Sequence, residues 1–236
     1  DMSRYWSWHE DYPRNFDILT IENRYLGNSY RIAGGMKYTI LSDNIGYVYY
    51  EDFSRAVGEG NLDEMLAYFA PCNGIIFDVR DNGGGTLTYA ERIAARFTNE
   101  KVHTGYIMHK TGPGHNQFSQ PKPVYVEPSN RIRWQKPVAV LTNRSAYSTT
   151  NEFANIMRYM PNAVLIGDRT GGGAGLPFTS ELPNGWGVRF SASPHLDAEK
   201  NHIEFGIEPD IKIDLTSLTL HDDIIEEARK TLKNMQ

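Results

Sequence analysis

The sequence predicts an α/β fold in which helices flank a central sheet. Apolar runs at 45–50, 74–80, 137–143 and 163–167 have the length and composition of buried strands. Amphipathic patterns follow the first three runs, with apolar residues spaced three and four positions apart. Because alternation of strand and helix usually gives parallel strands, we expect these runs to lie side by side in one core.

The first 44 residues differ from the rest of the chain because they show no long periodic pattern. They are aromatic and polar, with Tyr5, Trp6, Trp8 and Tyr12 near the start. We therefore interpret residues 1–44 as an N-terminal arm or the remnant of an upstream domain. Residues 45–236 then form the main domain, and a chain of 236 residues with 40% hydrophobic content can bury a sizeable core.

The helices are predicted from the spacing of their apolar residues. Leu62, Met65, Leu66 and Phe69 fall on one face, with Asn61 in place as an N-cap. The same argument predicts three further helices, around 87–97, 153–160 and 224–232.

Three further segments complete the prediction. Residues 100–136 are rich in Pro, Gly and scattered aromatic residues, which indicates an excursion from the sheet with one or two strands. The sequence Leu-Pro-Asn-Gly-Trp at 182–186 predicts a hairpin, and Val188–Ala192 alternates as a strand. A last short strand is predicted at 211–215.

Composition excludes several classes of protein. The net charge of −5 and the isoelectric point of about 5.8 argue against binding to nucleic acid or to an anionic membrane. Cys72 is the single cysteine, so no internal disulfide framework exists. No apolar run approaches the roughly 18 residues of a membrane span, and no His–x–His or HExxH pattern supports a metal site. We expect neither a metal nor a cofactor.

Ser148 stands between a predicted strand and a predicted helix, and two interpretations of it remain open. Ser148 or Thr149 could cap the helix, and Thr149 with Glu152 fits a capping box. Alternatively, Ser148 is a nucleophile, in which case the N–H of Thr149 and the helix dipole would stabilise a developing oxyanion.

Two glycine-rich loops follow other predicted strands. Gly83, Gly84 and Gly85 come directly after the strand at 74–80 and could form a simple turn. Three glycines lose much backbone entropy on folding, which favours a loop where a substrate carbonyl approaches exposed N–H groups. A phosphate site is disfavoured because neither GxxxxGK[ST] nor GxGxxG is present. The second permissive loop spans Gly171–Gly175.

From Ile45 to Ile211 the chain resembles the S41 peptidases, the carboxy-terminal processing and tricorn-like serine proteases. Four motifs carry the resemblance in order, namely Ile75–Gly85, Pro137–Arg144 running into Ser148, Leu165–Thr170 and Gly206–Asp210. The resemblance implies a core like that of ClpP and the crotonases. It also implies that Ser148 is the nucleophile and that Thr149 and Gly84 supply the oxyanion N–H groups. Gly83, Gly85, Gly172 and Gly173 would then contact the substrate.

The general base is where the chain departs from these relatives. One branch of the family uses a lysine, and the matching position here is Gly173, so a Ser–Lys dyad is unavailable. The tricorn-like branch, which the chain resembles better, uses an upstream histidine and a glutamate near the Gly-Ile-x-Pro-Asp turn. Glu204 is the candidate for that glutamate, to orient the base. We expect the histidine to belong to a segment upstream of this chain, so that no histidine or lysine of the chain bonds to Ser148.

The resemblance implies a serine peptidase that hydrolyses peptide bonds through an acyl-enzyme on Ser148, with a peptide or protein as its substrate. One alternative is a catalytically silent relative that binds peptides or glycans, and a less favoured one is a crotonase-like acyl-CoA enzyme. The resemblance also implies export in a bacterium, as a periplasmic protein or a lipoprotein anchored through a lipid outside this chain. The oligomeric state is left open.

Overall fold

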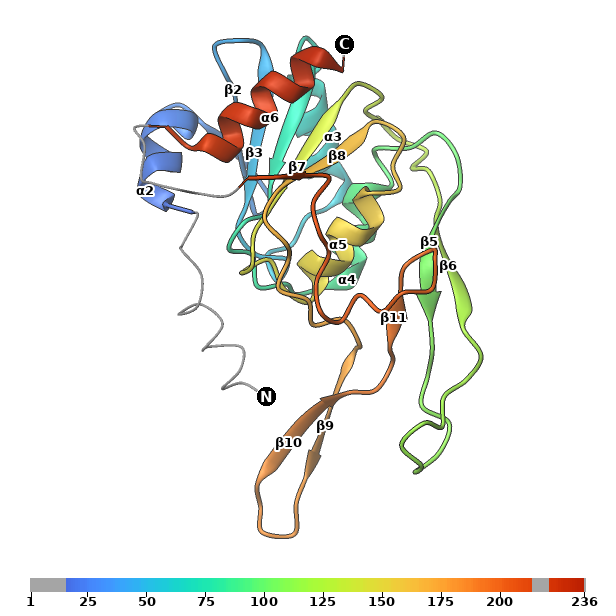
Figure 1. Cartoon of the computed structure of the whole chain (residues 1–236). Coiled ribbons are helices and arrows are strands. Elements are labelled where there is room, and N and C mark those ends of the chain that lie inside the picture. Colours follow the sequence, from blue (N-terminus) through green and yellow to red (C-terminus); the bar gives the residue numbers. More distant parts are fainter. Residues whose placement is uncertain (1–15, 214–220, 236) are drawn as a thin grey trace.

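A computed structural model describes residues 16–213 and 221–235, and its centre is a seven-stranded sheet (Figure 1). In sheet order the strands are β1 (Arg31–Ala33), β2 (Met36–Ile40), β3 (Ile45–Tyr50), β4 (Gly74–Asp78), β7 (Val138–Thr142), β8 (Ala163–Gly167) and β12 (Ile211–Lys212). The strands from β3 to β12 are parallel, and β1 and β2 are antiparallel to their neighbours. The predicted α/β class and its parallel core are confirmed.

The sheet begins earlier in the chain than its predicted first strand at 45–50. Strands β1 and β2 lie within the range 1–44 that we interpreted as an arm; β1 pairs with β2, and β2 pairs with β3. A short helix α2 (Ile18–Thr20) and a π-helical segment η1 (Ile21–Leu26) precede them, with Ile21 and Leu26 buried. From Phe16 onward this segment is therefore packed on the core, and the predicted aromatic arm at 5–12 lies outside the described residues.

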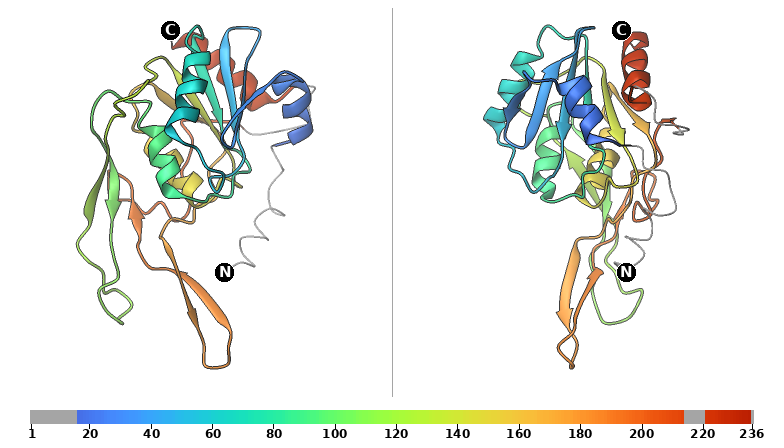
Figure 2. Two further views of the ribbon diagram at one scale, coloured as in Figure 1. Left: turned by 180° about the vertical axis from the view of Figure 1, so that it is seen from behind. Right: turned by 90° about the vertical axis from the view of Figure 1, so that its left-hand side faces the viewer.

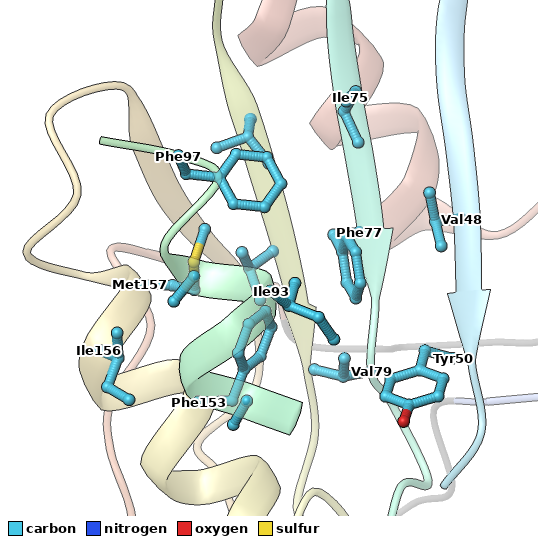
Figure 3. Packing of buried hydrophobic residues seen from close by; sticks show 14 of the residues in the cluster. Val48, Tyr50, Ile75, Phe77, Val79, Ile93, Phe97, Phe153, Ile156 and Met157 are labelled. Atoms are coloured by element: carbon cyan, nitrogen blue, oxygen red, sulfur yellow. The ribbon is translucent and has the colours of Figure 1, made fainter. Parts of the chain in front are cut away.

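Helices cover both faces of the sheet and create two hydrophobic cores (Figure 2). One face carries α3 (Glu59–Tyr68), α4 (Leu87–Ala94) and α5 (Thr149–Met157), and the other carries η1 and α6 (Asp223–Asn234). Figure 3 shows Phe77 of β4 near Phe153 of α5, and their ring centroids are 5.5 Å apart. Helix α5 is buried along its whole length, so the residue that precedes it is held firmly.

The start of α3 differs from its prediction. The helix begins at Glu59 after Gly58, so Asn61 is its third residue and not its N-cap. The Asn61 Oδ1 atom accepts a hydrogen bond from the Gly58 N–H at 2.9 Å. Asn61 therefore satisfies an N-terminal amide from inside the helix, as the third residue of a capping box does.

Two smaller sheets lie outside the central one (Figure 1). Strands β5 (Val102–Ile107), β6 (Lys122–Val126) and β11 (His195–Leu196) form a three-stranded sheet, which confirms strands in the predicted excursion at 100–136. Strands β9 (Pro177–Glu181) and β10 (Gly187–Ser191) form the hairpin predicted from residues 182–186.

The structure describes the environment of the single cysteine and the length of the helices. The Cys72 side chain is buried, and burial raises the pKa of its thiol to about 11. The thiol is therefore protonated and unreactive at neutral pH. Within the described residues, no helix is both long and apolar enough to cross a membrane.

Arg80 fastens the end of β4 to α6 through a buried ion-pair network. Its guanidinium donates to Asp78 Oδ1 at 2.9 Å and Oδ2 at 2.6 Å, and to Asp222 Oδ2 at 2.8 Å. Asp222 also caps α6 by accepting from the N–H groups of Ile224 and Ile225. The side chains of Arg80 and Asp78 are both fully buried.

Replacing Arg80 with methionine is expected to lower the free energy of unfolding by about 3–5 kcal/mol, because Asp78 is left buried without its counter-charge. The matched control is Lys101→Met, which removes the exposed ion pair with Glu127. That variant should unfold like the parent protein. Urea unfolding followed by circular dichroism measures both, and equal stabilities of the two variants would contradict the structural role given to Arg80.

Candidate functional site

Two turns meet at the carboxyl ends of the neighbouring strands β4 and β7. The N–H of Tyr147 donates to the carbonyl oxygen of Asn82 at 3.0 Å. The N–H of Asp81 donates to Asn143 Oδ1 at 3.0 Å, and Asn143 Nδ2 donates back to Asp81 Oδ1 at 2.8 Å. The predicted juxtaposition of the glycine loop and the serine turn is therefore present, at the sheet edge where α/β proteins place their ligands.

Ser148 adopts a backbone conformation that is rare outside glycine. Its φ is 59° and its ψ is −120°, and its N–H donates to the carbonyl oxygen of Gly172 at 2.8 Å. Such conformations cost free energy and persist where the surroundings hold them. A sharp strand–serine–helix turn of this kind exposes the serine hydroxyl in hydrolases that use a serine nucleophile.

The helix-capping interpretation of Ser148 is not supported by the hydrogen bonds. The Ser148 side chain makes no cap hydrogen bond to α5. The Thr149 hydroxyl donates to the Gly85 carbonyl oxygen at 2.7 Å, and the Glu152 carboxylate bonds to His195. The capping box suggested by Thr149 and Glu152 is therefore absent, and the Thr149 side chain instead ties the helix start to the glycine loop.

The three glycines of the loop differ in how closely they are packed. A Cβ at Gly84 would lie 2.7 Å from the Tyr147 carbonyl oxygen and 2.8 Å from Ser148 Cβ, and φ there is +100°. A Cβ at Gly85 would lie 2.3 Å from the Ser54 nitrogen, whereas one at Gly83 would meet nothing within 4 Å. Gly84 therefore lets the loop touch Ser148 directly, which no larger residue permits.

The two N–H groups that were predicted to hold an oxyanion differ in their hydrogen bonding. Within the described residues, the N–H of Thr149 meets no acceptor, as expected for the first amide of a helix. The N–H of Gly84 donates to Asn82 Oδ1 at 2.9 Å. Gly84 therefore packs against Ser148, and its N–H already has a partner.

Asn82 joins the parts of the site, and sequence reasoning missed its role. Its buried side chain donates to the Tyr50 carbonyl oxygen at 2.8 Å and accepts from the Thr150 hydroxyl at 2.7 Å as well as from Gly84. It thus links β3, the glycine loop and α5. The only signal in the sequence was its position directly before the glycines.

If Gly84 is an oxyanion donor, as the resemblance implies, Gly84→Ala is expected to lower kcat for peptide hydrolysis by about 10²–10³. The added methyl group would push against Ser148 and the N–H of Thr149. Gly60→Ala in α3 is the matched control, because a Cβ there meets nothing within 4 Å and Gly60 is not among the predicted substrate contacts. Steady-state kinetics of both variants in the full-length protein test the prediction, and equal kcat values would rule out close packing at Gly84 as a requirement.

The second glycine loop supports Ser148 from the other side. Gly172 accepts the Ser148 N–H, and the N–H of Gly173 donates to the Glu204 carbonyl oxygen at 2.9 Å. A Cβ at Gly173 would lie 2.2 Å from the Tyr147 ring, and φ there is +80°. The tyrosine ring therefore occupies the space that a side chain at position 173 would need.

Glu204 lies beside this loop. Its Oε2 atom is 3.5 Å from the position of a Cβ on Gly175, at the base of the β9–β10 hairpin. Burial raises the pKa of the Glu204 carboxyl, and a hydrogen bond from Ser191 and the charge of His195 oppose this. Glu208, by contrast, is largely exposed, with its carboxylate 3.8 Å from the Arg169 guanidinium.

His195 forms a buried pair with Glu152, which lies one helical turn after Ser148. This pair was not predicted from the sequence. His195 Nδ1 lies 2.9 Å from Glu152 Oε2, both side chains are buried, and within the described residues His195 Nε2 has no partner. Burial also raises the pKa of nearby Glu91, an effect that Glu152 enhances. No hydrogen bond joins the Ser148 hydroxyl to any described histidine or lysine, and these residues contain no cluster of metal ligands.

An open cavity of about 460 Å³ adjoins the glycine loop. Carboxylates predominate among its charged groups, with one guanidinium beside them. Its lining residues are Glu51, Asp52, Ser54, Arg55, Asp81, Gly83, Gly84 and Gly85. Space for a ligand is therefore present directly next to Gly84, on the side of the loop where Gly83 is open.

Comparison with known proteins gives a consistent picture. The model of peptidase family S41 matches residues 44–213. Carboxyl-terminal-processing peptidase 2 of Arabidopsis thaliana chloroplasts is 28% identical over 176 residues, which are 72% of this chain and 32% of that protein. An uncharacterized Chlamydia muridarum protein is 29% identical over 154 residues, 60% of this chain and 25% of its own length. The chain thus spans about a third or less of these curated relatives.

Solved structures agree on the fold. A Parabacteroides merdae protein named as a peptidase is 58% identical, with a TM-score of 0.92 over 97% of this chain and 73% of its own. Mature CPAF gives a TM-score of 0.70 at 14% identity, over 86% of this chain and 56% of its own, a likeness of fold alone.

Proposed function

The chain belongs to peptidase family S41, and on that premise we propose that it hydrolyses peptide bonds through an acyl-enzyme formed on Ser148. The observation that carries this proposal is the backbone of Ser148, which has a φ of 59° and a hydroxyl that caps no helix amide. A serine that served only as a helix cap would need neither feature, because caps take ordinary extended backbone angles.

In the proposed reaction, Ser148 Oγ attacks the carbonyl carbon of the scissile bond while its proton passes to a general base. The carbonyl oxygen becomes negatively charged and accepts a hydrogen bond from the N–H of Thr149, at the positive end of the α5 dipole. The amine leaves with the proton, and an ester remains on Ser148. Water then attacks this ester and releases a new carboxylate and the free serine.

Gly84 is the proposed second oxyanion donor, and Asn82 sets its position. Because the Gly84 N–H donates to Asn82 Oδ1 before substrate binds, it would share or exchange this bond as the oxyanion forms. The proposed substrate contacts are Gly83, Gly85, Gly172 and Gly173, whose small size gives a peptide access to the backbone of the loops.

Glu204 is proposed to orient the imidazole of the base. This role is supported by the hydrogen bond from the Gly173 N–H to the Glu204 carbonyl oxygen, because the neighbouring Gly172 accepts the Ser148 N–H. The expectation that the imidazole belongs to an upstream segment stays a prediction, so activity is tested in the full-length protein. Export in a bacterium, as a periplasmic protein or lipoprotein, stays a proposal that cell fractionation can test.

Cleavage in water enriched with ¹⁸O tests the function. The full-length protein is incubated with an unfolded polypeptide, and each new carboxyl terminus is expected to carry ¹⁸O while Ser148→Ala generates none. Tight binding of the polypeptide without cleavage would instead indicate a silent relative, and turnover of a thioester alone would indicate an acyl-CoA enzyme.

A further inference from the structure

The β9–β10 hairpin extends away from the body of the protein (Figure 1). Phe178 pairs with Phe190, and the N–H of Leu182 donates to the Trp186 carbonyl oxygen at 2.8 Å. Because side chains alternate along a strand, one side of the hairpin carries five apolar residues and Ser180. We call these five the hairpin face: Phe178, Leu182, Trp186, Val188 and Phe190.

Among the residues that the structure describes, the hairpin face is exposed. Trp186 is 71% exposed, Phe178 55% and Phe190 50%, and the rings of the two phenylalanines are 5.6 Å apart. Large side chains of this kind bury roughly 200 Å² each, so the face exposes about 500 Å² of apolar surface. Soluble monomers rarely keep a contiguous apolar patch larger than about 400 Å² unless it binds something. The other side of the hairpin carries polar residues, including Thr179 and Glu181.

The backbone of the hairpin is also incomplete. Within the described residues, β9 and β10 pair only with each other, so the outer edge of each strand has unused N–H and C=O groups. A two-stranded hairpin is at best marginally stable by itself, and a third strand completes it. An exposed edge of this kind takes up an extended peptide by strand addition.

The hairpin is rooted in the loop that holds Ser148. Gly172 accepts the Ser148 N–H, and three residues further along Gly175 accepts the N–H groups of Ala192 and Ser193, at 3.0 and 2.9 Å. Between Gly172 and Gly175, the N–H of Gly173 donates to the carbonyl oxygen of Glu204. Phe205, the residue after Glu204, is 74% exposed. A line of short contacts therefore joins the candidate nucleophile to the hairpin and carries a further exposed aromatic residue on the way.

We propose that the hairpin face docks an extended, apolar segment of the polypeptide substrate, which is then cleaved at Ser148; this inference rests on the proposed function. Strand addition supplies main-chain hydrogen bonds, and the face receives every second side chain of the segment. A second copy of the chain fits less well, because two faces together would bury only about 1,000 Å², the lower limit for a specific interface.

Binding to the full-length Ser148→Ala protein tests the docking surface without cleavage. Fluorescence anisotropy compares two labelled peptides of equal length and charge, one with Phe or Leu at every second position and one with Ser at those positions. The apolar peptide is expected to bind at least about 10-fold more tightly. Adding Phe178→Ser and Phe190→Ser should remove this preference, whereas the control Thr179→Ala with Glu181→Gln, on the other side of the hairpin, should keep it.

The hairpin variants are checked by thermal unfolding, and the single Trp186→Ser variant at the hairpin tip repeats the test if the double variant unfolds. Equal binding of the two peptides, or unchanged binding by the Phe variants, would overturn the inference. A dimer in sedimentation that the Phe variants dissociate would assign the face to self-association instead. Cleavage of short peptides by the parent protein is measured in parallel: its absence refutes the proposed function, whereas its presence without an apolar preference refutes only the docking surface.

Discussion

Replacing Ser148 with alanine in the full-length protein is expected to lower kcat for peptide hydrolysis by about 10⁶, because the group proposed to form the acyl-enzyme is removed. KM should change little, since the loops that would bind the peptide keep their contacts. Steady-state kinetics on a defined peptide measure both constants.

The control is Ser42→Ala, an exposed serine between β2 and β3, at the amino end of β3 and so at the opposite end of the sheet from the site. It should match the parent protein. A Ser148→Ala protein that retains full activity would show that another group is the nucleophile, whatever the conformation of this turn.

If Glu204 orients the imidazole of the base as proposed, replacing it with glutamine should lower kcat by about 10⁴. Glu208→Gln is the matched control, because Glu208 lies four residues along the chain and its largely exposed carboxylate is near Arg169 rather than the site. A similar loss of activity in both variants would refute the specific role of Glu204.

The raised pKa of Glu204 gives a second readout that separates catalysis from stability. Burial raises the pKa of Glu204 in the folded protein, so ionising the buried carboxyl costs free energy. The free energy of unfolding therefore decreases as the pH rises above the ordinary pKa of a glutamate. Glu204→Gln carries no charge, so its unfolding temperature at neutral pH should equal or exceed that of the parent protein. In the parent, kcat should fall as the pH drops through the raised pKa. A Gln variant that loses both stability and activity would indicate a structural role.

Periodicity predicted the four central strands and the amphipathic helices, and it missed β1 and β2 at one edge of the sheet. The apolar runs of β3, β4, β7 and β8 have no other stable position than the centre of a covered sheet. Strand β1 has three residues, and β2 alternates apolar and polar residues over Met36–Ile40. Both strands join the sheet through local hairpins: β1 pairs with β2 across Gly34 and Gly35, and β2 pairs with β3 across residues 41–44. The Gly-Gly turn is a hairpin signal that the search for long apolar periods did not use.

Two kinds of signal made part of the candidate site visible in the sequence: the place of Ser148 between a strand and a helix, and a position where only glycine fits. The close approach at Gly84 needs a glycine, so the loop was visible in the sequence. The pair between His195 and Glu152 joins residues 43 positions apart, and nothing local distinguishes it from surface residues. Asn82 likewise acts through Tyr50 and Thr150, which only the folded chain brings to it.

The most direct test of the central claim, that the meeting of the two turns makes Ser148 a nucleophile, is covalent labelling with a fluorophosphonate followed by peptide mapping. In the full-length protein under native conditions, the phosphonyl group is expected on Ser148, in the peptide that contains the start of α5, and heat-unfolded protein should remain unlabelled. Labelling of a different serine, or an unlabelled Ser148 in protein that still cleaves peptides, would contradict this account of the site.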